Sequence, residues 1–309
     1  MTEVNKNEVS EFIKELLVEA ASTISTGKVS LCTNENLPPN VQVQLVVKGN
    51  GEYAIYIRPE TLGDDYTISH EILHICASRV IPNFVRVLEP NVIGMIGTEL
   101  QGYLEHNWIR AEQEKRGLII DEQKLYQNLE QTLGSDQEGI EANINRILTL
   151  NNILHAFPSV YEKHKDFLHK NNSSSLAMSQ RIMSHYPRQV IYSNYEARKA
   201  TIQALKEWNK IIKENGIISV NLNLLLSVTP VFSAAQLKRA AGVILGLIPN
   251  AIVNHEKETT SHVLYTRSDG QGCVIFSMDE NGLRALDSYM NKMTLEEFLE
   301  MANMTYLLR

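Results

Sequence analysis

The amino-acid sequence predicts an α+β protein, with an α+β N-terminal part, a helical middle and a small α+β C-terminal part. Three observations lead to this prediction. Two strand-like runs near residue 50 are followed by two long helical patterns, the middle of the chain has mostly helical periodicity, and strand-like runs return after residue 260. A chain of 309 residues is long enough for one large core or several smaller ones. We expect parts at 1–118, 119–215 and 216–309.

The N-terminal part is expected to begin with an amphipathic helix over about residues 7–25, because apolar residues recur there at helical spacing. Two strands follow at 41–47 and 53–58. They flank the segment Lys48-Gly49-Asn50-Gly51-Glu52, whose Asn-Gly pair favours a tight turn between antiparallel strands. The sequence therefore predicts a β-hairpin directly before the first of the two long helical patterns.

Two helices are expected next, from Thr67 to about Arg79 and from about Asn91 to Lys115. The chain from 121 to 215 also has mostly helical periodicity, with a strong helix at 196–214. The run of Asn and Ser at 171–175 indicates a loop inside this region. The middle of the chain is therefore predicted to be a set of helices.

The pattern changes after Gly216. Residues 216–237 carry no charge but include many Ser, Asn and Thr, so a buried segment is a better interpretation than a membrane span. Strands are expected at 262–267 and 272–278. Thr294 and Glu297 form the sequence pattern of a capping box, which predicts a helix at the end of the chain.

Composition limits the classes of function. The net charge is −7 and no long Lys/Arg run occurs, so we expect no nucleic-acid partner. The three cysteines, Cys32, Cys76 and Cys273, are far apart and form no Cys-x-x-Cys pair, which argues against a disulfide framework or a cysteine zinc ribbon. The first twenty residues have no apolar signal-peptide core. A cytoplasmic protein fits these features best.

The segment His70-Glu71-Ile72-Leu73-His74 carries the strongest chemical signal. On a helix, residues i and i+4 lie one turn apart on the same face, so both imidazoles can bind one zinc ion. Zinc lowers the pKa of a bound water, and the carboxylate of Glu71 can then accept its proton as a general base. Zn²⁺ is the metal that two imidazoles on one helix favour. The alternative interpretation is a pair of hydrogen-bonded core histidines beside a surface glutamate.

This segment resembles the motif of the zincin zinc metallopeptidases: an uncharged residue, His, Glu, two uncharged residues, His and a hydrophobic residue. The resemblance extends over about residues 40–115 and includes similarity to the intracellular ImmA/IrrE group. It implies a small zincin-like core within 1–118, composed of a strand hairpin, the helix with the motif and a second ligand helix. It also implies that the strand at 53–58 holds an extended peptide substrate by strand addition.

The resemblance further implies a third metal ligand, which the gluzincins take from a glutamate on the next helix. The expected helix 91–115 offers Glu99, Glu105 and His106. A helical wheel puts Glu99 and His106 at the border of its apolar face and Glu105 nearly opposite. All three stay open as the third ligand, and those that do not bind metal can still orient the ligating imidazoles.

The function expected from these features is hydrolysis of a peptide bond in a peptide or protein substrate, with His70, His74 and one residue of the second helix as zinc ligands. Two other functions stay open. The long remainder of the chain suits a non-catalytic zincin-like binding or regulatory protein, and the motif also suits a zinc hydrolase that acts on another bond. Four tyrosines are candidates for stabilising an oxyanion: Tyr53, Tyr56, Tyr66 and Tyr103. The oligomeric state does not follow from the sequence.

Overall fold

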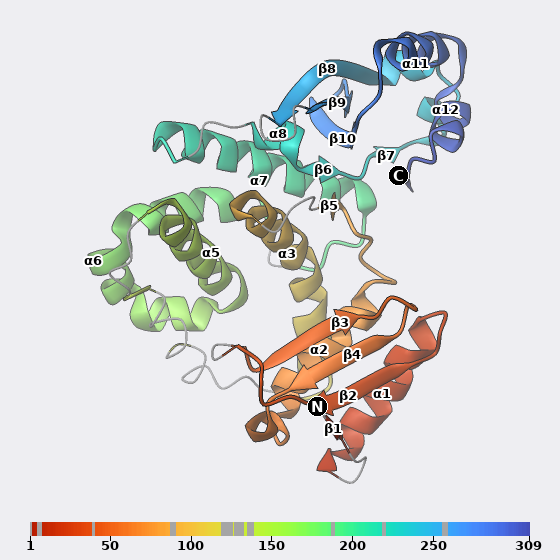
Figure 1. The fold of residues 1–309 in the computed structure, drawn as a ribbon. Coiled ribbons are helices and arrows are strands. Elements are labelled where there is room, and N and C mark those ends of the chain that lie inside the picture. The colour runs from red at the N-terminus through yellow and green to blue at the C-terminus, as the bar shows by residue number, and fades with distance from the viewer. Residues whose placement is uncertain are drawn as a thin grey trace. The chain divides into compact units, whose positions relative to one another are not determined.

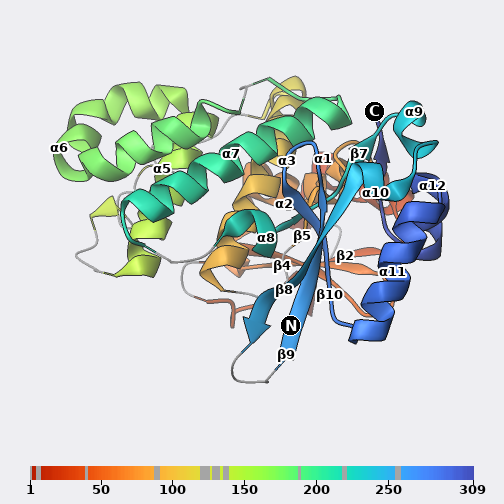
Figure 2. The ribbon, with the colours of Figure 1, turned by 90° about the horizontal axis from the view of Figure 1, so that it is seen from above.

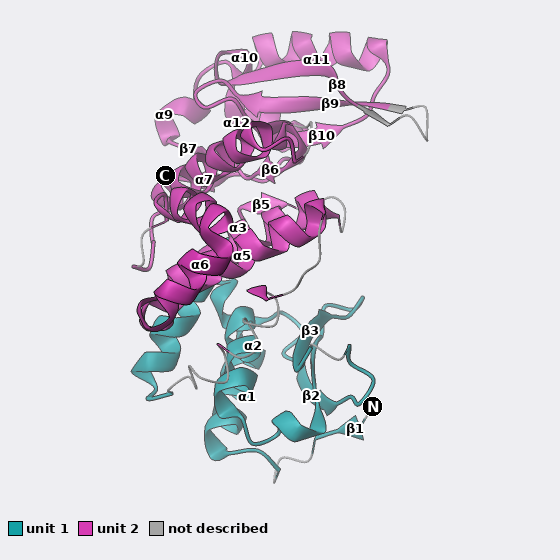
Figure 3. Cartoon of the chain, turned by 90° about the vertical axis from the view of Figure 1, so that its left-hand side faces the viewer, with its two compact units in different colours: residues 1–82, 105–125 teal, residues 83–104, 126–309 magenta. Residues whose placement is uncertain are grey.

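The computed structural model describes residues 2–4, 8–38, 41–86, 91–118, 126, 133–134, 139–186, 189–217, 221–254 and 259–309. Helices and strands are both abundant, which confirms the α+β class. The chain folds into two compact units, residues 1–82 with 105–125 and residues 83–104 with 126–309 (Figure 3). The boundary falls inside helix α3 (Val92–Lys115). This division differs from the three parts expected from the sequence, whose boundaries stay predictions.

The first unit contains a sheet in the strand order β1-β2-β4-β3 (Figure 1). Its strands are β1 (Thr2–Glu3), β2 (Val29–Thr33), β3 (Val43–Val47) and β4 (Tyr53–Ile57). β3 and β4 pair in antiparallel register, which confirms the predicted hairpin. The short strand β2 was not expected, and it pairs with β4 in parallel. β4 thus lies inside the sheet, with Ala54, Ile55 and Ile57 buried.

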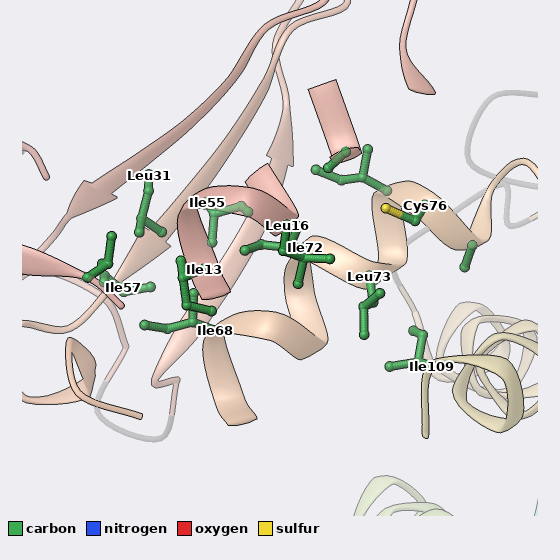
Figure 4. Close-up of a cluster of buried hydrophobic side chains, with 14 residues drawn as sticks. Ile13, Leu16, Leu31, Ile55, Ile57, Ile68, Ile72, Leu73, Cys76 and Ile109 are labelled. Carbon is green, nitrogen blue, oxygen red and sulfur yellow. The ribbon is translucent and has the colours of Figure 1, made fainter. Parts of the chain in front are cut away.

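Two helices pack on this sheet, α1 (Glu11–Thr23) and α2 (Asp65–Ala77). α1 begins later than the sequence pattern suggested, because Ser10 caps it by accepting a hydrogen bond from the Ile13 amide. A short 3₁₀ helix, η2 (Pro59–Thr61), connects β4 to α2. The core between the helices and the sheet includes Ile13 and Leu16 of α1, Leu31 of β2, Ile55 of β4, Ile68 and Ile72 of α2, and Ile109 of α3 (Figure 4).

The C-terminal half of α3 belongs to the first unit. Ile109 is fully buried in the core just described. At the end of α3, Arg116 donates two hydrogen bonds of 3.0 Å to the carboxylate of Glu19 on α1. These contacts attach α3 to both the core and α1, so the half of α3 from Glu105 onward is held in a defined register against the N-terminal elements.

The second unit contains the helices α5 (Ile140–Ala156), α6 (Pro158–Met183) and α7 (Asn194–Glu214). The predicted loop at 171–175 is wrong, because the helical pattern continues through it in α6. The chain kinks there instead, with non-helical angles at the buried Asn172. Much of the expected helical region at 119–138 lies outside the described residues.

The C-terminal part of the second unit contains a three-stranded antiparallel sheet in the order β10-β9-β8 (Figure 2). Its strands are β8 (Leu245–Asn254), β9 (Thr259–Thr266) and β10 (Gln271–Phe276). Helices α11 (Glu280–Lys292) and α12 (Leu295–Met301) share a hydrophobic core with it. Thr294 and Glu297 form the predicted capping box at the start of α12. The expected pair of strands is thus confirmed, and β8 adds a third.

The uncharged segment 216–237 forms several short elements rather than one long one. Those of its described residues are α8 (Leu222–Leu225), β6 (Ser227–Val228), β7 (Val231–Phe232) and α9 (Ala234–Leu237). β6 pairs with β5 (Val85–Arg86), β7 pairs with β11 (Leu307–Leu308), and α10 (Ala241–Ile244) follows α9. Among the described residues, no helix has the length and apolar character that crossing a membrane requires.

Candidate metal centre

The apolar residues of helix α2 and its two motif histidines lie on different faces of the helix. Asp64 caps the helix by accepting hydrogen bonds from the backbone N–H of Thr67 at 3.0 Å and from its hydroxyl at 2.8 Å. Ile68, Ile72 and Ile75 share one face, since they are four and three residues apart, and all three are buried in the core. At 100° per residue, His70 and His74 project from the opposite side of α2.

Three histidines converge beside α2. The ring centroids of His70 and His74 are 5.0 Å apart, and His106 of α3 lies 5.0 Å from His70 and 5.1 Å from His74. One ring nitrogen of each lies within 4.8 Å of the others. Among the described residues, this is the group of His, Cys, Asp and Glu side chains that could hold a metal ion. The structure therefore brings together the two predicted motif histidines and one of the three candidates on α3.

Glu105 contacts the group from outside. Its Oε2 lies 2.9 Å from Nδ1 of His74. An ionised carboxylate can only accept a hydrogen bond, so this contact favours the neutral tautomer of His74 that donates from Nδ1 and keeps the lone pair on Nε2. A carboxylate that holds the far nitrogen of an imidazole in this way orients metal-binding histidines in many proteins. Glu105 is therefore placed to orient His74, whereas the sequence alone left it open as a ligand.

Glu99 does not join the three histidines. It precedes His106 by seven residues, which on α3 is about 10 Å along the helix axis. Its carboxylate accepts a hydrogen bond from Nδ2 of Asn152 at 3.4 Å, within the second unit. Burial raises the pKa of Glu99 to about 7, and the hydrogen bond from Asn152 opposes that shift only in part. Glu99 is thus a half-buried carboxyl group whose hydrogen-bond partner is Asn152 and not one of the three histidines.

The three imidazoles suit a zinc ion chemically. Tetrahedral zinc with nitrogen ligands needs nitrogens about 3.3 Å apart, and one ring nitrogen of each histidine lies within 4.8 Å of the other two. Ligating histidines must be neutral. Burial, with smaller contributions from His74 and Arg110, lowers the pKa of His70 to about 3, while hydrogen bonding to Gln113 acts in the opposite direction. Three protein nitrogens would leave a fourth position for water, as in catalytic rather than structural zinc sites.

Glu71 lies between the two motif histidines in sequence and is half-buried. Burial raises the pKa of its carboxyl group, and the nearby His74 lowers it by a smaller amount. Within the described part of the chain, the Glu71 carboxylate has neither a hydrogen bond nor an ion pair. No described neighbour holds its oxygens, so Glu71 is a candidate general base at the centre.

Two further residues share the face of α3 that carries His106, and one of them bonds to α2. Arg110 and Gln113 follow His106 by four and seven residues. Gln113 is buried and donates from Nε2 to the backbone oxygen of Tyr66 at 2.9 Å and to Oγ of Ser69 at 3.0 Å. Sequence reasoning missed both residues, although their spacing from His106 was a usable signal.

The four candidate tyrosines fall in different places. Tyr66 stands one turn before His70 on α2, on the face of the histidines. Tyr53 and Tyr56 lie on β4. Tyr103 is buried in the second unit, where its ring contacts His155 and Tyr186. Tyr66 is therefore the member of this set whose helix position best matches a role beside the histidines.

No protein-family model, no curated protein and no solved structure matches this chain. Evidence for the function of this chain therefore comes from the residues of the centre.

Proposed function

We propose that this protein is a zinc-dependent metallopeptidase of zincin type, with His70, His74 and His106 as metal ligands and Glu71 as general base. The observation that carries the proposal is the convergence of three ring nitrogens from two helices at the His-Glu-x-x-His motif. A chance match to the short motif would not be expected to bring a third histidine from a distant segment to the same place.

Zinc bound by these imidazoles would act as a Lewis acid that lowers the pKa of a bound water and polarises the substrate carbonyl. The chain supplies the remaining chemistry. Glu71 accepts a proton from the attacking water as its oxygen bonds to the carbonyl carbon, and then transfers that proton to the leaving nitrogen as the C–N bond breaks. Glu105 keeps His74 in the tautomer that presents Nε2. The products are a carboxylate and an amine.

The metal content of the purified full-length protein tests the proposal first. We expect about one zinc per chain by elemental mass spectrometry in the wild type, and loss of that zinc in both His74→Ala and His106→Ala. Glu99→Gln is the matched control on α3, because Glu99 lies two turns from His106, and it should retain the metal. Retention of zinc by His106→Ala together with its loss from Glu99→Gln would contradict the ligand set.

A peptide library with products identified by mass spectrometry then tests the reaction. Cleavage that stops with a chelator and returns with zinc supports a peptidase. Turnover restricted to amide or ester compounds other than peptides would replace the peptidase with another zinc hydrolase. A zinc-loaded protein without turnover of any compound would support the non-catalytic binding function.

A further inference from the structure

We propose that Arg110 forms an anion-binding subsite beside the histidine group and that it selects substrates with a carboxylate next to the bond to be cleaved. The proposal deepens the proposed function and rests on it. It assigns to the site a substrate class, acidic peptides, for which the His-Glu-x-x-His motif itself carries no information.

The packing of α3 against α2 determines where Arg110 lies. His106 meets His70 and His74, and seven residues later Gln113 bonds to Tyr66 and Ser69. The two helices therefore pass each other in opposite directions along this face. Arg110 stands between His106 and Gln113 on the same side of α3. It consequently faces α2 at the level of His70 and Tyr66.

Electrostatic coupling between these groups agrees with that position. Arg110 and Tyr66, which stands one turn before His70 on α2, shift each other's pKa values through their charges. Burial lowers the pKa of Arg110 itself to about 10, so the guanidinium is still charged at neutral pH.

The guanidinium is poorly neutralised for a half-buried group. Its hydrogen bond within the described residues runs from Nη2 to Oδ1 of Asn107 at 2.9 Å, and no described carboxylate lies within ion-pair distance. Glu114, one turn further along α3, affects its pKa only through space. By comparison, Arg116, the residue directly after α3, pairs with both Glu19 and Glu112. Most of the five N–H donors of Arg110 are thus available for a ligand.

A carboxylate is the ligand that matches this arrangement. An arginine fork binds a carboxylate through two parallel hydrogen bonds, and a single cation matches the single charge. A phosphate dianion would gain from a second cation beside the guanidinium, whereas a carboxylate is matched by Arg110 alone. The carboxylate can come from an Asp or Glu side chain or from the C-terminus of a peptide, and the experiment separates these two sources.

The test uses the full-length protein loaded with Co²⁺, whose visible absorption reports ligands of the metal without any turnover. The probes are three dipeptides with a metal-binding hydroxamate at one end: one with a free C-terminal carboxylate, one amidated with an Asp side chain, and one amidated with Asn. We expect at least one acidic probe to bind about 10-fold or more tightly than the Asn probe. Whichever acidic probe is preferred identifies the source of the carboxylate.

The variants assign this preference to one side chain. Arg110→Gln should reduce it to about 2-fold or less while Co²⁺ affinity is kept or increased, because a nearby positive charge is removed. Arg110→Lys should keep part of the preference, since it retains the charge without the fork. Arg79→Gln is the matched control: Arg79 is exposed on the same unit and donates to the backbone oxygen of Ser22.

Two failures can be told apart. If the wild type binds Co²⁺ but binds all three probes equally, the anion subsite is overturned and the metal centre stands. If the wild type binds no Co²⁺, the metal centre is overturned and the subsite with it. Loss of Co²⁺ affinity in a folded Arg110→Gln protein would assign Arg110 a structural role instead and overturn the proposal.

Discussion

Glu71 is the residue on which the proposed chemistry depends most directly. We expect Glu71→Gln to retain zinc and the fold but to lower kcat by about 10²–10⁴-fold, because glutamine has the same shape and cannot accept the proton. Zinc content and peptide turnover measured on one preparation check this expectation. Wild-type turnover in the zinc-loaded variant would exclude Glu71 as the base.

The raised pKa of Glu99 makes the stability of the folded protein depend on pH. Its pKa of about 7 in the folded protein lies above the ordinary value of 4.5, so the folded state binds one proton more between these two pH values. Stability therefore falls as pH rises from about 4.5 to 7, by up to about 3 kcal/mol. The loss persists above pH 7, where the carboxyl group is charged although burial disfavours the charge.

The variant Glu99→Gln tests this sign. It should raise the free energy of unfolding at pH 8 and have little effect near pH 4.5, where the wild-type carboxyl group is also neutral. Denaturant midpoints across this range measure the difference. A variant that is less stable than the wild type at pH 8 would contradict the expectation and would mean that the hydrogen bond from Asn152 outweighs the cost of burying the charge.

At the scale of elements, the centre depends on the register between α2 and α3. Two polar contacts connect these helices within a largely apolar interface. They join Glu105 to His74 and Gln113 to Ser69. Ile109 lies between these contacts in sequence and is buried in the core. A slip of one residue along α3 would turn the histidine away by 100°. Apolar packing thus sets the distance between the helices, and the polar pairs select the register.

The Glu105 contact gives a prediction about metal affinity. Glu105→Gln preserves a hydrogen-bond acceptor for His74 but removes the negative charge, and we expect it to weaken zinc binding about 10-fold. Competition with a chromophoric chelator measures the affinity. The matched control is Glu15→Gln on the exposed side of α1, which should bind zinc as the wild type does. Equal affinities for the two variants would contradict an orienting role for Glu105.

At the scale of the whole molecule, the metal centre belongs to one of two units. All three histidines, together with Glu71 and Glu105, lie in residues 1–82 and 105–125. A ligand that binds only the folded state stabilises it by about 2.7 kcal/mol at 100 times its dissociation constant. Zinc should therefore stabilise the first unit directly and the second unit only as far as the two unfold together.

The two tryptophans separate these responses, because Trp108 lies in the first unit and Trp208 is buried in the second. In Trp208→Phe, the fluorescence of Trp108 should report a melting midpoint that zinc raises by roughly 10 °C. In Trp108→Phe, Trp208 should report little change. Equal shifts of both midpoints would show that the chain unfolds as one cooperative body.

Local sequence patterns were sufficient to predict many of the helices and strands, and to predict that the residues of the His-Glu-x-x-His motif lie on one helix. The β3–β4 hairpin depended on an Asn-Gly turn, and the start of α12 on a capping box, which are interactions between residues a few positions apart. Patterns of this kind failed at 171–175, where the chain continues as a kinked helix with Asn172 buried. They also missed β2, whose five residues form a strand by pairing with the distant β4.

The sequence by itself determined that His70, Glu71 and His74 stand together on one helix, because the spacing i, i+4 is a property of the helix alone. Only the tertiary structure decided which side chain of α3 meets them, and that Arg110 faces the same place. From the sequence, Glu99, Glu105 and His106 were all candidates, although the helical wheel put Glu105 on another face. The choice among them depends on how Ile109 and its neighbours pack, and that packing is a long-range interaction which no local spacing contains.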